Sequence, residues 1–289
     1  MRKLVLVSLT LLLFCYAAPR NLQAQQAQPQ PLTFYYDYHV NPGQEEEFMK
    51  LVQTVGAPVR DKLMADGVVL AWGIETPVLR SPGGTTHLIW FSVENYGGVE
   101  KVLNAMEAQL AKLAADEAKA NDAARAKKQQ PMMTTAERQR EVFDMTKTRD
   151  WLTRDLVAGY GPTPAAGTLP AIRYNFVKVR AGKGAAYRAA WEKYNKPVYD
   201  KLVADGVILA YGLAAEDVKT DGDFTHFTWY ATANMAAMDK VGPAFDADRS
   251  RRSQEERDAI FDLFTNLTDR DMARSIVTRS RIFKVAGMK

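Results

Sequence analysis

Strand-like and helix-like patterns follow one another in two stretches that begin 139 residues apart. Residues 32–40 (LTFYYDYHV) are rich in aromatic and β-branched side chains, which is typical of a strand, and residues 171–179 (AIRYNFVKV) are their counterpart. Apolar residues then recur at helical spacing. In the first stretch they are Phe48, Leu51, Val52 and Val55, and in the second they include Tyr187, Trp191 and Tyr194. Both stretches are therefore predicted to fold as a strand followed by a helix.

The strongest similarity lies where each helix ends. Residues 58–73 (PVRDKLMADGVVLAWG) and 197–212 (PVYDKLVADGVILAYG) share 12 of 16 positions. An Asp-Gly pair stops each helix, because glycine adopts the left-handed C′ conformation at little cost. Alternating large and small residues (VVLAWG, VILAYG) predict the next strand. Most of these identities therefore have a structural explanation.

The remaining elements complete the order β-α-β-β-α-β in each half. A turn leads to the strands THLIWFSV and THFTWYAT, and a second helix begins near Asn95 or Asn234. Residues 32–103 align without a gap to 171–242 with 22 identities in 72, which indicates duplication of a whole domain. In the first half, residues of about 106–130 form an Ala/Lys/Glu-rich insertion, predicted to be a solvated helix. The predicted halves are residues 32–165 and 171–289, joined by a linker at 166–170.

The N-terminus has the pattern of a secretory signal peptide. Arg2 and Lys3 precede an apolar run, and small residues ending at Ala24 follow it. The run is too short for a typical membrane span. We therefore expect residues 1–24 to be removed, residues 25–31 to be a disordered segment, and the mature protein to be periplasmic or secreted from a bacterium, with no membrane attachment. An uncleaved N-terminal anchor is the alternative.

Charge and cysteine content exclude several classes of function. The net charge of +4 includes Arg2, Lys3 and Arg20, and without residues 1–24 it is +1. A nearly neutral mature chain gives no electrostatic case for binding nucleic acid. The only cysteine is Cys15, so the mature protein would contain neither a disulfide nor a nucleophilic thiol.

Two tandem β-α-β-β-α-β units with an aromatic-rich third strand resemble the dimeric α/β-barrel superfamily of ferredoxin-like domains. The superfamily includes cofactor-free monooxygenases of the antibiotic-biosynthesis type, haem-degrading monooxygenases, chlorite-dismutase-like proteins, and NIPSNAP- and EthD-like domains. The resemblance implies an α+β fold in which two sheets pack face to face into a barrel. Here a fused pair of halves would form a pseudo-dimeric barrel, closed either within one chain or between chains.

The candidate site residues occur in pairs at equivalent positions of the two halves. The repeated THxxW motif contributes two histidines and two tryptophans, and residues three apart on a strand point to opposite faces. One of each pair is therefore expected to face the interior. The histidines are interpreted either as proton shuttles or ligands at an interior cavity, or as strand-start residues bonded to the preceding loop. The complete set of pocket candidates is His87, Trp90, His226, Trp229, Tyr35, Tyr174, Trp72 and Tyr211.

Two functions fit this set. The first is binding of a small apolar or aromatic molecule between the two sheets, without a required cofactor. The alternative is a cofactor-free or haem-linked monooxygenase-like enzyme acting on an aromatic substrate. No metal-ligand spacing is present among the three histidines, so no metal is predicted. A homo-oligomer is compatible with the resemblance.

Overall fold

The computed structural model describes residues 30–80, 84–219 and 223–287. Their strands close into one eight-stranded barrel in the order β1-β3-β2-β8-β5-β7-β6-β4, with β4 pairing back to β1. Every neighbouring pair is antiparallel. The predicted signal peptide, residues 1–24, and most of the predicted segment 25–31 lie outside the described residues.

The elements follow the predicted order in both halves. Those of the first half are β1 (Leu32–Tyr38), α1 (Glu45–Leu51), the π-helical turn η1 (Val52–Gly56), α2 (Ala57–Ala65), β2 (Val69–Pro77), β3 (His87–Val93), α3 (Tyr96–Ala126), α4 (Thr135–Val142) and β4 (Arg149–Tyr160). Those of the second half are β5 (Ala171–Val179), α5 (Gly184–Tyr194), α6 (Lys196–Ala204), β6 (Ala210–Val218), β7 (His226–Thr232), the 3-10 turn η2 (Met235–Lys240), α7 (Val241–Ser250), α8 (Gln254–Leu267) and β8 (Thr268–Val285). The fold is the predicted α+β pseudo-dimeric barrel.

The barrel closes within one chain because the last strand of each half joins the two halves together. β4 pairs with β1 of its own half and with β6 of the other half. In the same way β8 pairs with β5 and with β2. The sequence left open whether the barrel closes within one chain or between chains, and these pairings show closure within one chain.

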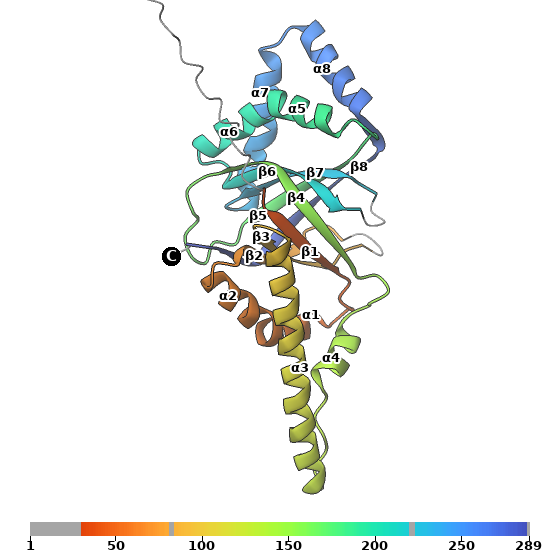
Figure 1. The fold of residues 1–289 in the computed structure, drawn as a ribbon. Helices are drawn as coiled ribbons and strands as arrows, with labels where there is room; N and C mark the ends of the chain where they lie inside the picture. The colour runs from red at the N-terminus through yellow and green to blue at the C-terminus, as the bar shows by residue number, and fades with distance from the viewer. Residues whose placement is uncertain (1–29, 81–83, 220–222, 288–289) are drawn as a thin grey trace, which may run out of the picture.

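Helices cover the barrel on two opposite sides. Those of the first half lie on one side and those of the second half on the other (Figure 1). Each layer has its own apolar core between sheet and helices, with Phe48, Trp72 and Phe91 buried in the first and Trp191 and Tyr211 in the second. A third cluster of buried aromatic side chains fills the barrel interior. The sheet is therefore buried on both faces.

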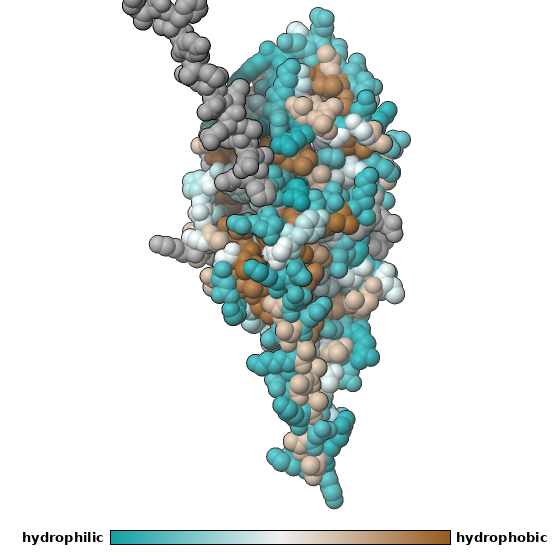
Figure 2. Space-filling model, in the orientation of Figure 1, coloured by the Kyte–Doolittle hydropathy of each residue, from teal (hydrophilic) through white to brown (hydrophobic). Residues whose placement is uncertain are grey.

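Helix α3 is continuous over 31 residues and projects well beyond the barrel (Figure 1). The Asn95 side chain caps its start by accepting a hydrogen bond from the Gly98 N–H at 3.1 Å. The projecting part shows hydrophilic and only mildly hydrophobic residues (Figure 2), as expected for a solvated helix. Glu117 and Asn121 on this part accept hydrogen bonds from the segment leading into α4. No helix in the described ranges has the length and apolar content to cross a membrane.

Candidate functional site

The two histidines of the repeated motif face the helices. His87 begins β3, and its ring lies 4.3 Å from that of Phe48 in the first helix-covered core. His226 begins β7, and its ring lies 5.5 Å from that of Tyr187 on α5. In both cases Nδ1 is within hydrogen-bond distance of the hydroxyl of the preceding threonine, at 3.1 and 2.9 Å. These are the contacts of the strand-start interpretation.

Burial lowers the pKa of both His87 and His226 to about 4. Between pH 6.5 and 4 the unfolded chain takes up protons at these positions and the folded chain does not. The contribution of each histidine to the free energy of unfolding therefore falls as the pH falls through this window, by up to about 3 kcal/mol. We expect His226→Gln to remove one such contribution. Urea denaturation at pH 6.5 and 4.5 would check this, and an unchanged pH dependence in the variant would contradict it.

Trp72 and Tyr211 also lie outside the barrel, and each joins its strand to a helix. The Trp72 indole N–H donates to Asp61 on α2 at 3.0 Å. The Tyr211 hydroxyl donates to Asp200, which occupies the equivalent position on α6. The aspartate and the aromatic residue both belong to the 16-residue repeated stretch. This contact therefore gives a structural reason for part of the similarity between the two copies.

The other four candidates, Tyr35, Tyr174, Trp90 and Trp229, belong to the interior cluster. A second feature of the repeat explains how the two indoles fit. A Cβ atom added to Gly73 would lie 2.8 Å from the ring of Trp90, and one added to Gly212 would lie 2.5 Å from that of Trp229. Trp90 and Trp229 thus pack directly on the glycines of the WG and YG sequences.

Trp90 and Trp229 each also donate to a buried carboxyl group. Trp90 Nε1 donates to Glu75 Oε1 at 2.5 Å, and the hydroxyls of Tyr174 and Thr278 donate to the same carboxyl group. Glu75 is fully buried. Burial raises its pKa to about 7, against the opposing effect of these three donors.

Asp155 is the second interior acid, and it accepts a longer hydrogen bond of 3.4 Å from Trp229 Nε1. Burial raises the pKa of Asp155 to about 7 as well. The two acids occupy related places: Glu75 pairs with Ser280 across β2 and β8, while Asp155 pairs with Ala214 across β4 and β6. At each of the two junctions between the halves, β2–β8 and β4–β6, one strand therefore carries an interior acid: β2 carries Glu75 and β4 carries Asp155.

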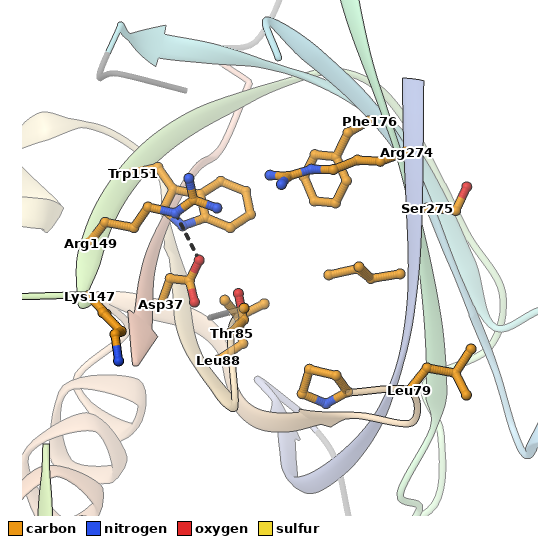
Figure 3. Close-up of a pocket in the computed structure, with 13 residues that line it drawn as sticks. Asp37, Leu79, Thr85, Leu88, Lys147, Arg149, Trp151, Phe176, Arg274 and Ser275 are labelled. Carbon is orange, nitrogen blue, oxygen red and sulfur yellow. Dashed lines mark hydrogen bonds and ion pairs between the residues drawn. The ribbon is translucent and has the colours of Figure 1, made fainter. Parts of the chain in front are cut away.

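An open cavity of about 570 Å³ lies at the end of the barrel where β1, β2 and β5 finish. Its lining residues come from six strands, the β2–β3 loop and the α4–β4 loop: Asp37, Pro77, Leu79, Gly84, Thr85, Leu88, Lys147, Arg149, Trp151, Phe176, Arg274, Ser275 and Ile276. Figure 3 shows Trp151 and Phe176 near one another, with the Arg274 side chain extending across Phe176, and the centroids of the two rings lie 5.8 Å apart. The wall therefore combines two aromatic side chains with four charged ones, Asp37, Lys147, Arg149 and Arg274.

The cavity exists because the two halves differ at this end. Phe224, two residues before His226, packs on Trp151 with ring centroids 5.2 Å apart. The residue two before His87 is Thr85, which leaves the matching space open. Likewise Leu88, which lines the cavity, is smaller than its counterpart Phe227 in the second half. Smaller side chains in the first half thus create the cavity.

Charged groups at the cavity are only partly paired. Arg149 Nε bonds to the buried Asp37 carboxylate at 3.0 Å (Figure 3), and Lys147 pairs with Asp144 at 2.9 Å. The guanidinium carbon of Arg274 lies 5.0 Å from the ring centre of Phe176, a cation–π contact.

Sequence reasoning did not single out the residues that form this site. It missed the acids Glu75 and Asp155 and the cavity residues Trp151, Phe176 and Arg274. For Glu75 a signal was present, because an acid stands at an inward-facing position of an otherwise apolar strand (VLAWGIETP). Trp151 and Phe176 gave no such signal, because their counterparts Ile276 and Asp37 are not aromatic. The match between Arg149 and Arg274 becomes visible only from the strand pairing.

The residues at the cavity do not fit a histidine-ligated haem. His87 and His226 face the helices, and His39 contacts the Gly84 carbonyl through Nδ1 at 3.1 Å; none of the three lines the cavity. Within the described ranges, no group of three or more His, Cys, Asp or Glu residues is placed to hold a metal ion.

The closed barrel with helices on both sides is the fold of the dimeric α/β-barrel superfamily, as the sequence resemblance predicts. A protein from Fusobacterium nucleatum provisionally assigned as a monooxygenase superposes with a TM-score of 0.56 and 11% identity, over 90% of this chain and 96% of that one. A similarly assigned protein from Lactobacillus acidophilus gives 0.54 and 11%, over 89% and 97%. No family model and no curated protein sequence matches the chain. At this identity the similarity establishes the fold alone.

Proposed function

We propose that this protein binds a small, flat aromatic molecule in the cavity at the end of the barrel. The observation that carries the proposal is the cavity itself, about 570 Å³ in volume and bordered by Trp151 and Phe176. Small-molecule sites usually occupy about 300–1,000 Å³ and combine apolar walls with a few polar groups. Trp151 and Phe176 are themselves only 5% and 2% exposed, so a planar ligand would contact the parts of their rings that border the cavity.

Thr85→Phe tests this proposal, because it places in the first half the side chain that Phe224 supplies in the second. The added ring is expected to fill the cavity and weaken binding of 2-naphthamide, a neutral planar probe, at least tenfold. Thr85→Val is the matched control, since it keeps the size of threonine and leaves the cavity open. Isothermal titration calorimetry on all three proteins gives the answer. Failure of the wild type to bind the probe, or equal binding by Thr85→Phe, would refute the proposal.

A second candidate is an enzyme that oxidises its aromatic ligand with molecular oxygen. The provisional names of the two similar structures support it, as do the buried carboxyl groups Glu75 and Asp155 with pKa values of about 7. Glu75 pairs with the cavity residue Leu88 across β2 and β3, which places a group able to accept a proton next to the site. Without a cofactor, the electrons for oxygen would come from the substrate. Oxygen uptake in the presence of an electron-rich bound phenol would favour this candidate, and its absence would favour binding alone.

We further propose that the protein is exported. The support is the signal-peptide pattern of residues 1–24, with its basic start, apolar run and small residues up to Ala24.

A further inference from the structure

Two arginines occupy equivalent positions at the cavity. Arg149 on β4 pairs in the sheet with Asp37 on β1, and Arg274 on β8 pairs with Phe176 on β5. Asp37 and Phe176 themselves stand at equivalent positions of the two halves. Each half thus places an arginine at the cavity, but the residue paired with it is an acid in the first half and a phenylalanine in the second.

This difference decides the charge state of the site. In the first half, the Arg149 charge is neutralised by Asp37 at 3.0 Å. In the second half an aromatic ring takes the place of the acid, and Arg274 lies over it. Throughout the part of the chain that the structure describes, no carboxylate lies within ion-pair distance of Arg274. Asp223 and Asp37 attract it only from a greater distance.

The surroundings of Arg274 favour the arrival of an anion. Partial burial and the neighbouring Arg149 charge both lower the pKa of Arg274, and so disfavour its charged form. A carboxylate beside the guanidinium would reverse this, because charge-assisted Arg–carboxylate hydrogen bonds are among the stronger ones in proteins. The wall also contains a buried indole N–H, Trp151 Nε1, that has no acceptor among the described residues. An unmet buried donor is uncommon in proteins and is often found at functional sites.

We propose that the ligand of this cavity is an aromatic carboxylate, with its carboxylate bound by Arg274 and its ring lying in the cavity beside Trp151 and Phe176. This inference rests on the proposed function and specifies its ligand class. A singly charged carboxylate matches Arg274, the one cation of the cavity lining that has no ion pair to an acid among the described residues. The planar fork of arginine binds the two carboxylate oxygens together.

The test compares two probes of the same shape, 2-naphthoate and the neutral 2-naphthamide, by calorimetry on the full chain at pH 7.5 and 50 mM NaCl. The wild type is expected to bind 2-naphthoate about tenfold more tightly, as a partly exposed charge-assisted pair allows. In Arg274→Gln this preference is expected to disappear while the Kd for 2-naphthamide stays within about twofold. Raising the NaCl concentration to 500 mM should weaken binding of the naphthoate only.

Arg279→Gln is the matched control. Arg279 lies on the same strand, is exposed, and does not line the cavity, so the variant should keep the preference of the wild type. Equal affinity of the wild type for the two probes would overturn the inference and leave the proposed function standing. Retention of the preference in Arg274→Gln would also overturn it. Binding of neither probe would refute both.

Discussion

Replacing Gly73 with valine is expected to lower the free energy of unfolding by about 4 kcal/mol. The first added carbon would lie 2.8 Å from the Trp90 ring and 2.9 Å from the Ile282 carbonyl oxygen, and the latter belongs to the backbone of the neighbouring strand β8. Trp90 would have to move, and its hydrogen bond to Glu75 would be lost. The cost combines the strain of overpacking with an unsatisfied buried donor.

Gly242→Ala serves as the control for this experiment. Gly242 lies in α7 with no atom within 4 Å of the added carbon. Alanine there is expected to raise the free energy of unfolding by up to about 1 kcal/mol, because it favours the helix and restricts the unfolded chain. Urea denaturation followed by circular dichroism measures both changes. A Gly73→Val protein as stable as the wild type would show that the indole does not pack on this glycine.

The stability that Glu75 confers is expected to depend on pH by about 3 kcal/mol. Its folded-state pKa is raised to about 7, so the folded chain keeps the proton over a range in which the unfolded chain has already lost it. This contribution is complete below the ordinary carboxyl pKa and is lost as the pH rises through 7. The free energy of unfolding of the wild type, minus that of Glu75→Gln, should therefore fall between pH 4.5 and 7.5.

The difference between two proteins is needed because four groups titrate in overlapping ranges. Asp155 acts in the same direction as Glu75, while His87 and His226, with lowered pKa values, act in the opposite direction. The wild type alone should show only a shallow pH profile. In the double variant Glu75→Gln/Asp155→Asn, the pH-dependent change in this difference from the wild type should roughly double. A difference that rises with pH, or stays constant, would contradict the assignment of a raised pKa.

Local sequence signals predicted the order of the elements and several of their boundaries. The Asp-Gly pairs end α2 and α6 as expected, and Gly67 and Gly206 have φ values of +74° and +68°. Alternation along β3 and β7 predicted that histidine and tryptophan would face opposite sides. It could not say which of the two faces the interior, because both faces of this sheet are buried and carry large side chains.

The site was harder to predict for a related reason. Similarity between the two halves drew attention to the 16-residue stretch that contains Asp61, Trp72 and Gly73, which joins a helix to a strand. The cavity depends on positions where the halves diverge, such as Thr85 against Phe224. Which of those differences leaves a space depends on the packing of strands distant in sequence, and a single sequence does not contain that information.

The covalent connection between the halves makes such a site available. In a barrel assembled from two identical polypeptides, any substitution near the symmetry axis would appear twice. Both sides would then carry an acid that cancels its arginine, or both would carry a phenylalanine. When one polypeptide supplies both sides, each side can change independently. One guanidinium, that of Arg149, can then be neutralised by an acid while the equivalent one, that of Arg274, is not.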